Sequence, residues 1–345
     1  MAKAKKLTKA QVRRIKANQA KKLNNQSHQD DWQDNELGDA QPGTVISRFG
    51  QHADVEAADG NVFRCNLRRS IGSLICGDNV LWRAGKLTEH SISGVIEAVH
   101  DRSSVLSRPD VYDGVKPIAA NISQILIVSS VLPAFNADII DRYLVAAEHT
   151  DIKPVIVLNK IDLFNDKNQI EITKQLDIYR DIGYQVIYVS NETQQGIDEL
   201  TAQLKNNTSV FVGQSGVGKS TLTNSLMPEL GVMTKKVSEN SGLGQHTTTV
   251  ARLYHFEQGG DLIDSPGIRE FGLWHLTPEQ VYHGFIEFSK YIGHCKFRDC
   301  NHQNDPACAL ILAAEQHQIH PERLASFQRI LNSLNDNTLT SRFND

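Results

Sequence analysis

One eight-residue segment restricts the possible folds of this chain more than any other. Residues 213–220 read GQSGVGKS and fit the pattern G-x-x-x-x-G-K-[ST]. The segment follows the apolar run Val210–Val212 and precedes a helical pattern over Ser220–Leu226, the strand–loop–helix context in which such a loop holds phosphates. Its glycines allow the backbone to curl so that N–H groups at the start of the helix point at an anion. A glycine-rich turn without a ligand is the alternative, and the complete motif in its proper context disfavours it.

Each part of this loop has an expected role. Lys219 should reach the β- and γ-phosphates and act as a catalytic residue, and the Ser220 hydroxyl should bind Mg²⁺. The remaining members should surround the phosphates. The residues of this motif expected to bind the nucleotide are Gly213, Gln214, Ser215, Gly216, Val217, Gly218, Lys219 and Ser220.

A second motif, NKID, directly follows an apolar strand pattern and ends at Asp162. The Asp162 carboxylate can accept two hydrogen bonds from guanine N1–H and N2–H₂, whereas adenine offers no such donor pair. We expect Asn159 to tie this loop to the phosphate loop, and the stem of Lys160 to lie along the base. Ser190, at the end of the next expected strand, is placed to complete the base pocket. The motif alone would also suit a capped surface turn, but beside a phosphate loop it favours guanine over adenine.

Two further segments are candidates for sensing the γ-phosphate. Asp264 begins the sequence DSPG and can hold Mg²⁺ through water, while the N–H of Gly267 can meet the γ-phosphate. Residues 242–249 read GLGQHTTT, whose glycines give mobility and whose threonines can bind Mg²⁺ when a triphosphate is present. Of its three threonines the last two suit that role better, and Thr248 is the one we assign. The expected magnesium ligands are therefore Ser220, Thr248 and Asp264.

The group that activates water is less well defined. Residues 268–270 are IRE, so the glutamine that usually follows a DxxG motif is absent. His246, in the glycine-rich segment, is the best replacement as a catalytic residue, because an imidazole can orient or deprotonate water near neutral pH. The alternative is that His246 only packs or contacts a partner.

The order of the motifs is unusual. Regulatory GTPases usually place the guanine motif after DxxG, whereas here NKID precedes the phosphate loop. The same parts are therefore present in a circularly permuted order, which preserves the site if the original termini lie close together. A domain that follows the DSPG motif would be attached directly to the switch, so a switch movement could act on it.

The flanking patterns predict an α/β core preceded by a barrel. Apolar strand patterns alternate with helical ones, which indicates a mainly parallel sheet covered by helices. Upstream, the five strand patterns between residues 44 and 99 predict a small closed barrel, with the OB-fold as the leading choice. The core strands are expected at 124–130, 153–158, 184–189 and 209–212, its helices at 138–149, 169–182 and 197–205, and the barrel strands at 44–49, 51–57, 62–67, 79–83 and 92–99. Such a barrel can bind RNA or DNA, or serve only as a scaffold.

The charge distribution singles out the N-terminus. Residues 1–22 carry nine basic side chains and no acidic one, while the rest of the chain carries 27 basic and 40 acidic groups. A basic arm on an acidic body suggests a nucleic-acid-binding tail, and a solvated terminus without a partner is the alternative. Residues 23–40 are rich in Asn, Gln and Asp and are typical of a flexible linker.

Three of the five cysteines lie close together near the C-terminus, in the pattern C-x4-C-x-H-x5-C. Three thiolates and one imidazole are the tetrahedral donor set of a closed, structural zinc site. An odd and low cysteine count favours a reducing compartment over a disulfide framework. The expected zinc ligands are Cys295, Cys300, His302 and Cys308. The helical pattern that begins at Pro321 should pack this domain through an apolar face, and binding a partner is the minority interpretation.

These patterns predict a multi-domain α/β protein. Its expected parts are a basic arm and linker (1–40), an OB-fold barrel (41–108), a circularly permuted P-loop GTPase domain with a mainly parallel sheet (109–275), and a helical zinc-binding domain (276–345). No window holds 18 consecutive apolar residues, and the N-terminus lacks an apolar signal core, so we expect neither a membrane span nor secretion.

This combination of motifs resembles the RsgA (YjeQ) family of small-ribosomal-subunit-dependent GTPases over roughly residues 40–335. The resemblance implies a bacterial, cytoplasmic, monomeric GTPase that acts late in maturation of the small (30S) subunit and is stimulated by it. It also implies that the barrel and the zinc domain both lie against ribosomal RNA. Its phosphate site extends to Thr221, and its guanine and zinc residues coincide with those named above.

Two other functions compete with that of an assembly GTPase. One is a signalling GTPase that switches a protein partner without touching RNA, and the barrel, zinc motif and basic arm weigh against it. The other is a non-enzymatic RNA-binding module with a vestigial nucleotide site, which the intact Lys219, Ser220, Asp162 and Asp264 disfavour. We expect GTP hydrolysis to promote release, because loss of the γ-phosphate frees the switch that it orders.

Overall fold

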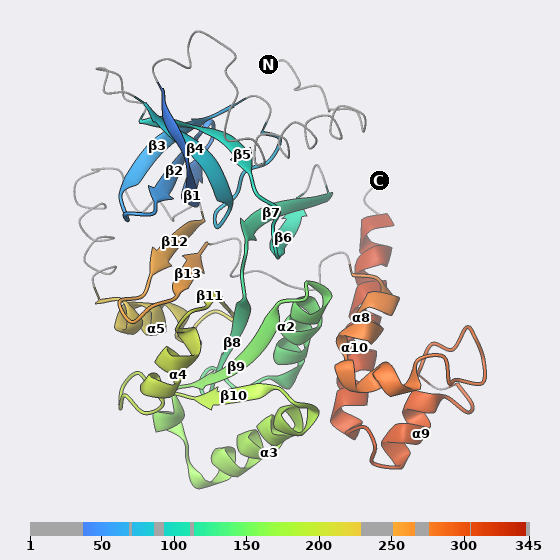
Figure 1. The fold of residues 1–345 in the computed structure, drawn as a ribbon. Helices are drawn as coiled ribbons and strands as arrows, with labels where there is room; N and C mark the ends of the chain where they lie inside the picture. Colours follow the sequence, from blue (N-terminus) through green and yellow to red (C-terminus); the bar gives the residue numbers. More distant parts are fainter. Residues whose placement is uncertain are drawn as a thin grey trace.

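A computed structural model describes residues 37–68, 71–85, 93–110, 114–228, 251–265, 276–303 and 305–342 (Figure 1). The basic arm expected at residues 1–22 lies outside these residues. So do His246, Thr248 and Gly267, which carry the expected catalytic, magnesium and γ-phosphate roles.

The first five strands form the predicted barrel. They are β1 (Leu37–Phe49), β2 (His52–Ala57), β3 (Val62–Leu67), β4 (Asn79–Gly85) and β5 (Gly94–Val99). β1 pairs with both β2 and β4, and β3 pairs with β5 in parallel, so the sheet closes on itself. Trp82 fills the interior and is completely buried, as are Val45, Val55 and Ile96. The prediction of a small five-stranded closed barrel is thus confirmed.

Both expected boundaries of the barrel require correction. β1 begins at Leu37, inside the segment assigned to the linker, because its first residues pair with the end of β4. The expected boundary at 108/109 falls inside β6 (Val105–Asp110), which forms a two-stranded hairpin with β7 (Gly114–Ala120). Neither strand has the continuous apolar run that marks the core strands, so the sequence pattern gives no sign of this hairpin.

The central sheet has the predicted, mainly parallel architecture. Its strand order is β10-β9-β8-β11-β13-β12, and all neighbours are parallel except β12 and β13. The strands are β8 (Gln124–Ser130), β9 (Lys153–Asn159), β10 (Gln185–Tyr188), β11 (Thr208–Val212), β12 (Arg252–His255) and β13 (Asp261–Asp264). The helices are α2 (Ala137–His149), α3 (Asp166–Ile182), α4 (Ile197–Leu204) and α5 (Lys219–Leu226).

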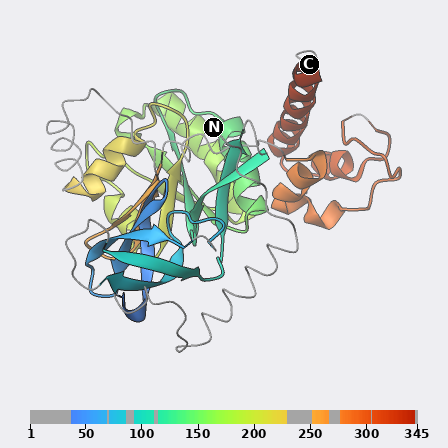
Figure 2. The same ribbon diagram turned by 90° about the horizontal axis from the view of Figure 1, so that it is seen from above.

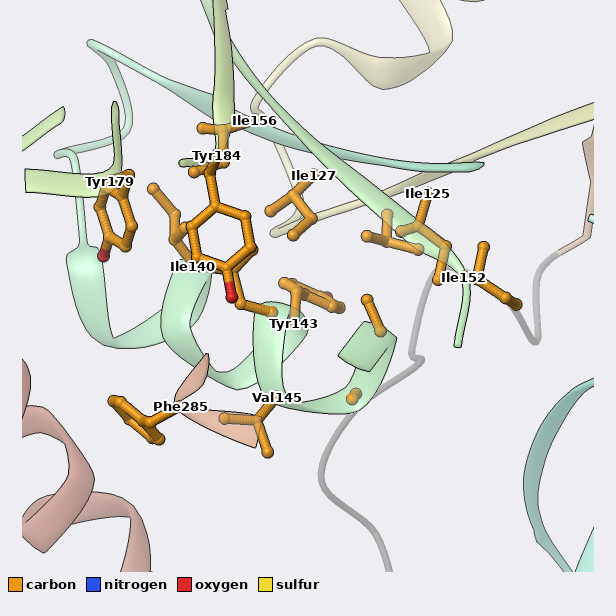
Figure 3. Packing of buried hydrophobic residues seen from close by; sticks show 14 of the residues in the cluster. Ile125, Ile127, Ile140, Tyr143, Val145, Ile152, Ile156, Tyr179, Tyr184 and Phe285 are labelled. Carbon is orange, nitrogen blue, oxygen red and sulfur yellow. The ribbon is translucent and has the colours of Figure 1, made fainter. Parts of the chain in front are cut away.

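Alternate residues of β8 explain why the sheet carries helices on both faces. Ile125 and Ile127 pack in one hydrophobic cluster with residues of α2 and α3, whereas Leu126 and Val128 pack in a second cluster with residues of α4 and α5. A strand buried on both faces reads as a continuous apolar run, which is the signal that predicted it. Figure 3 shows the first face, with Ile140 of α2 pointing at the sheet.

The barrel is joined directly to the central sheet. Ser47 in β1 pairs with Arg252 in β12, so the two sheets form one eleven-stranded arrangement. Beside this junction the His255 ring lies 2.6 Å from Asp261 Oδ1 and 2.7 Å from Glu56 Oε2. The Asp261 hydrogen bond and the charge of Glu56 raise the pKa of His255 to about 9, so it is charged at neutral pH and holds β2 of the barrel to the β12–β13 hairpin.

The C-terminal residues form a helical lobe beside α2 (Figure 1), which Figure 2 shows to one side of the rest of the molecule. It consists of α8 (Pro278–Gly284), the 3₁₀ helix η3 (Ile286–Tyr291), α9 (Ala309–Glu315) and α10 (Pro321–Arg342). Phe285, Phe288 and Phe327 form its aromatic core, with Phe327 edge-on to both other rings. The apolar face of α10 packs into the same core, as predicted. In the described ranges, no helix is long and apolar enough to cross a membrane.

Candidate active site and metal centre

The phosphate loop connects β11 to α5, as the motif predicts, and its backbone explains two of its glycines. Gly213 has φ +137° and Gly218 has φ +98°, a region that residues with a Cβ rarely adopt. A Cβ at Gly213 would lie 2.1 Å from Val128 O, and one at Gly218 would lie 2.3 Å from Asn159 Nδ2. Only glycine allows this loop to lie so close to β8 and β9.

The side chain of Lys219 folds back over the loop that precedes it. Its Nζ donates to Gly213 O at 2.6 Å and to Gln214 O at 2.7 Å. The positive charge therefore lies within the curl of the loop, beside the N–H groups at the start of α5. Gln214, Ser215, Ser220 and Thr221 are exposed around it, so a phosphate chain can reach them.

The guanine motif lies against the phosphate loop. Asn159, at the end of β9, is buried, and its Nδ2 donates to Val217 O at 2.9 Å. This is the predicted tie between the two loops. Lys160 Nζ donates to Gly216 O and to Leu132 O, both at 2.7 Å. Lys160 thus joins three loops that follow three neighbouring strands. The Leu132 carbonyl was not foreseen, because a backbone acceptor leaves no signal in the sequence.

Asp162 and Ser190 are brought together at the next position along the same edge. Ser190 is completely buried, and its hydroxyl donates a short hydrogen bond to Asp162 Oδ1. The Thr193 N–H donates to Ser190 Oγ at 3.1 Å, which fixes the hydroxyl so that its own hydrogen points at Asp162. The Asp162 side chain is otherwise exposed, and the carboxylate can accept from a planar base. Thr193 is a second residue that the sequence did not predict, again because it acts through its backbone.

Asp264 ends β13 on the other side of the phosphate loop. β13 runs parallel to β11 with Asp261 opposite Thr208, so Asp264 lies level with the last residues of β11. Ser265, the next residue, is buried. The carboxyl ends of neighbouring parallel strands meet at one edge of the sheet, the usual place for a ligand in this architecture. Asp264 is therefore on the side of the phosphate loop opposite the guanine motif.

Four candidate metal ligands meet between η3 and α9. The His302 Nδ1 atom lies 3.5 Å from the sulfurs of Cys300 and Cys308 and 3.6 Å from that of Cys295. The sulfurs of Cys295 and Cys308 are 3.9 Å apart, and all four donor atoms lie within 4.8 Å of one another. Around one zinc ion, tetrahedral geometry separates two sulfurs by about 3.8 Å and a sulfur from a nitrogen by about 3.5 Å. The donor set therefore fits a single tetrahedral ion.

Neighbouring groups hold these ligands in place. The Tyr282 ring stacks on His302 with centroids 4.9 Å apart, and Gln328 Nε2 of α10 donates to His302 O at 2.8 Å. The Ala309 N–H donates to the sulfur of Cys295 at 3.4 Å. Burial lowers the pKa of His302, which keeps the imidazole in the neutral form that binds metals.

The fold and the motif geometry define a circularly permuted P-loop GTPase with a barrel before it and a Cys₃His metal-binding lobe after it. The family model of the RsgA GTPase matches residues 99–274. A relative from Pectobacterium atrosepticum named small ribosomal subunit biogenesis GTPase RsgA is 57% identical over 343 residues, which cover 99% of this chain and 98% of the relative. A Klebsiella pneumoniae relative of the same name is 56% identical and covers 98% of this chain and 97% of the relative. The chain belongs to the RsgA GTPase family.

Solved structures agree with this assignment. YjeQ from Thermotoga maritima superposes with a TM-score of 0.69 at 31% identity, covering 86% of this chain and 98% of that structure. YloQ, described as a circularly permuted GTPase, gives a TM-score of 0.68 at 27% identity and covers 86% of this chain and 96% of that structure. The predicted family, fold class and GTPase activity are confirmed by these comparisons.

Proposed function

We propose that this chain hydrolyses GTP as an assembly factor in biogenesis of the small ribosomal subunit. The observation that carries the proposal is the match to relatives with this name along almost the whole chain, at more than half identity. The geometry supports it, because the base and phosphate motifs lie together at one edge of the sheet although they are far apart in the sequence.

Guanine recognition falls to Asp162, which accepts from the base N1–H and N2–H₂ while Ser190 orients it. Asn159 and Lys160 hold this loop against the phosphate loop, and the methylene stem of Lys160 lies along the base. Adenine would leave the carboxylate without donors, so adenine nucleotides should bind much more weakly.

Phosphate binding falls to the residues of the loop from Gly213 to Thr221. Lys219 stabilises the charge that develops on the β- and γ-phosphates. Mg²⁺, which neutralises part of that charge when bound, would be held by Ser220 and Thr248 directly and by Asp264 through water. We assign the γ-phosphate contact to the Gly267 N–H and the orientation of the attacking water to His246.

The metal of the Cys₃His group is zinc in this proposal. Three thiolates and one imidazole suit zinc, and a set of four protein ligands leaves no open position, so the ion is structural. It would fix the loop between η3 and α9 relative to α10.

The RNA of the small subunit is the proposed partner. In the barrel, the Arg64 guanidinium lies 5.6 Å from the ring centroid of exposed Phe49, a pairing that suits stacking with a nucleobase. The basic arm at residues 1–22 would add contacts to phosphates. The protein would act as a cytoplasmic monomer and leave the subunit after hydrolysis, because loss of the γ-phosphate frees the switch.

The test is GTP turnover by the purified protein, alone and with equimolar small subunits, at low and at physiological salt. The proposal predicts strong stimulation by small subunits, none by large subunits, and weaker stimulation as salt rises, because contacts to phosphates release counterions. If turnover is unchanged by small subunits, the partner is wrong and a GTPase that switches a protein becomes the better interpretation.

A further inference from the structure

A buried arginine connects the metal-binding lobe to the GTPase domain. Arg323, in the first turns of α10, is only 2% exposed. It donates to Asp141 of α2 through Nη1, and to the Glu287 carboxylate of η3 through Nε at 2.6 Å and Nη2 at 3.2 Å. Its guanidinium carbon also lies 4.3 Å from the ring centroid of Phe285. One planar guanidinium thus bridges two carboxylates from different parts of the chain.

Asp141 is held from the GTPase side as well. The Tyr179 hydroxyl of α3 donates to Asp141 Oδ1 at 2.7 Å, with a longer contact of 3.2 Å to Ala137 O at the start of α2. Tyr179 and Asp141 are both almost completely buried. Asp141 therefore ties α2 to α3 through Tyr179 and to α10 through Arg323, and α2 and α3 follow the strands β8 and β9 that end at the nucleotide site.

The N-terminal end of α2 supports the phosphate loop. Ile139 and Ile140, together with Pro133 before the helix, face Gln214 and Val217 across a space of only about 10 Å³. Close packing of this kind transmits a displacement rather than absorbing it. A shift of α2 would therefore move the phosphate loop.

The segment before α2 also reaches the guanine motif. Leu132 O accepts from Lys160 Nζ at 2.7 Å, and the same Nζ donates to Gly216 O. Gly216 lies against Pro133, whose Cδ would be 3.7 Å from a Cβ at that position. The Val131 N–H donates to Asn159 O at 3.2 Å. The segment 131–136 is thus part of the frame that holds both nucleotide-binding loops, and α2 fixes its far end.

We propose that Arg323 is a positioning residue for the guanine-nucleotide site: by clamping α2 between α3 and α10, it holds the segment 131–136 in the place where Lys160 and the phosphate loop are aligned. The metal-binding lobe would then support the nucleotide site in addition to any contact that it makes with RNA. The proposal rests on the nucleotide site proposed above and adds a residue that touches neither base nor phosphate.

The experiment measures the affinity and the dissociation rate of a fluorescent GDP on the full chain loaded with metal, for wild type and Arg323→Lys. Lysine keeps the charge but has no planar fork, so it cannot bridge Asp141 and Glu287 in the same way. We expect the Kd for GDP to rise between about twofold and about thirtyfold, through faster dissociation. Amide hydrogen exchange at residues 131–136 should accelerate in the same variant.

The matched control is Arg329→Met, on the same helix. Arg329 pairs with Asp138 of α2 at 2.6 Å, but their side chains are 50% and 35% exposed, so water screens the pair and it should contribute little. This variant should bind GDP within about twofold of wild type. Because Arg329 links the same two helices, an equal loss of affinity in both variants would mean that any contact between these helices matters and would overturn a specific role for Arg323.

A purely structural role predicts a different result. If Arg323 only stabilises the fold, Arg323→Lys lowers the unfolding midpoint but leaves the Kd and dissociation rate of the folded protein unchanged, which would overturn the proposal. If Arg323→Lys does not fold, Asp141→Asn provides the same comparison, because it weakens the bond from Arg323 to α2 while the bonds from Arg323 to Glu287 stay in place. Wild-type protein that binds no GDP would overturn the proposed function, and this inference with it.

Discussion

Replacing Asp162 by asparagine tests guanine recognition most directly. Ser190 donates to Asp162 Oδ1, and the Asp162→Asn side chain would keep that bond by turning its carbonyl oxygen toward Ser190. The amide NH₂ would then face the base in place of a carboxylate oxygen. Two donors, the amide and guanine N1–H or N2–H₂, would point at each other.

The size of the effect follows from these contacts. Hydrogen bonds to a charged group contribute about 1.5–3 kcal/mol each, and the variant loses at least one and leaves a donor of the base unpaired. We therefore expect GDP binding to weaken by about 2–5 kcal/mol, a factor between about thirty and several thousand in Kd. Xanthosine diphosphate, which carries a carbonyl at C2 in place of the amino group, should weaken much less or bind better, because the amide can donate to it.

The assay is a competition titration of GDP and xanthosine diphosphate against a fluorescent nucleotide, with Ser190→Ala as the comparison. Ser190→Ala removes the orienting donor but keeps the carboxylate, so it should weaken GDP by about 1 kcal/mol and leave the preference for GDP unchanged. If Asp162→Asn binds GDP within about threefold of wild type, Asp162 does not read the base and the guanine assignment is wrong.

Three further outcomes follow from other parts of the molecule. Lys219→Ala should lower GTP turnover by at least about a hundredfold, because Lys219 stabilises charge on the phosphates. The fold should be kept, because Lys219 Nζ bonds to carbonyls of the phosphate loop rather than to the core of the sheet. Single-turnover hydrolysis and circular dichroism would check both results, and full activity would refute a catalytic role. Cys308→Ala should abolish binding of one metal ion per chain and lower the unfolding midpoint, because it removes a ligand. Cys65→Ala is the control: it removes a buried thiol of the barrel, far from the metal ligands in the sequence, and should retain the metal. Metal analysis of both variants would check this. The pKa of His255 is raised from 6.5 to about 9 in the folded protein, so its charge stabilises the fold fully below about pH 6.5, and this contribution is lost as the pH rises through about 9. His255→Gln should therefore lower the free energy of unfolding at about pH 6 and hardly change it at about pH 10. Denaturant unfolding at the two pH values would check this, and equal effects at both would refute the ion-pair role.

The sequence predicts those parts of the molecule that short-range patterns encode. The continuous apolar run of β8 identifies a strand buried on both faces, and the spacing of Cys295, Cys300, His302 and Cys308 places four ligands within one short segment. The GKS and NKID motifs identify the side chains that are expected to bind the nucleotide. Both motifs follow strands of the same sheet, so the contact from Asn159 to Val217 could be expected as well.

Other features depend on contacts that no short pattern contains. Leu132 and Thr193 act through backbone atoms, so any residue type could provide the same groups. The pairing of Ser47 with Arg252 joins segments that are far apart in the chain and has no local signal. Arg323 reads in sequence as an ordinary charged helix residue, and only the fold shows that it is buried between two carboxylates.

The circular permutation explains where the two additional parts of the chain are attached. The loop that joins α4 to β11 is short, from Lys205 to Asn207, and the Asn207 N–H donates to Leu204 O. This loop connects the two positions that are the chain termini in GTPases with the usual motif order. The new break lies between β13, which ends at Asp264, and β8. The barrel and its hairpin enter at the start of β8, whereas the chain that leads to the metal-binding lobe leaves from Asp264, the expected magnesium residue at the end of β13. The barrel is in addition paired to β12, directly after the segment that carries His246 and Thr248. The sequence order anticipated such a coupling only for the C-terminal domain, whereas the sheet topology extends it to the barrel. We therefore propose that a change at the γ-phosphate acts on the C-terminal lobe through the chain after β13 and on the barrel through the pairing of β12 with β1, which would promote release after hydrolysis.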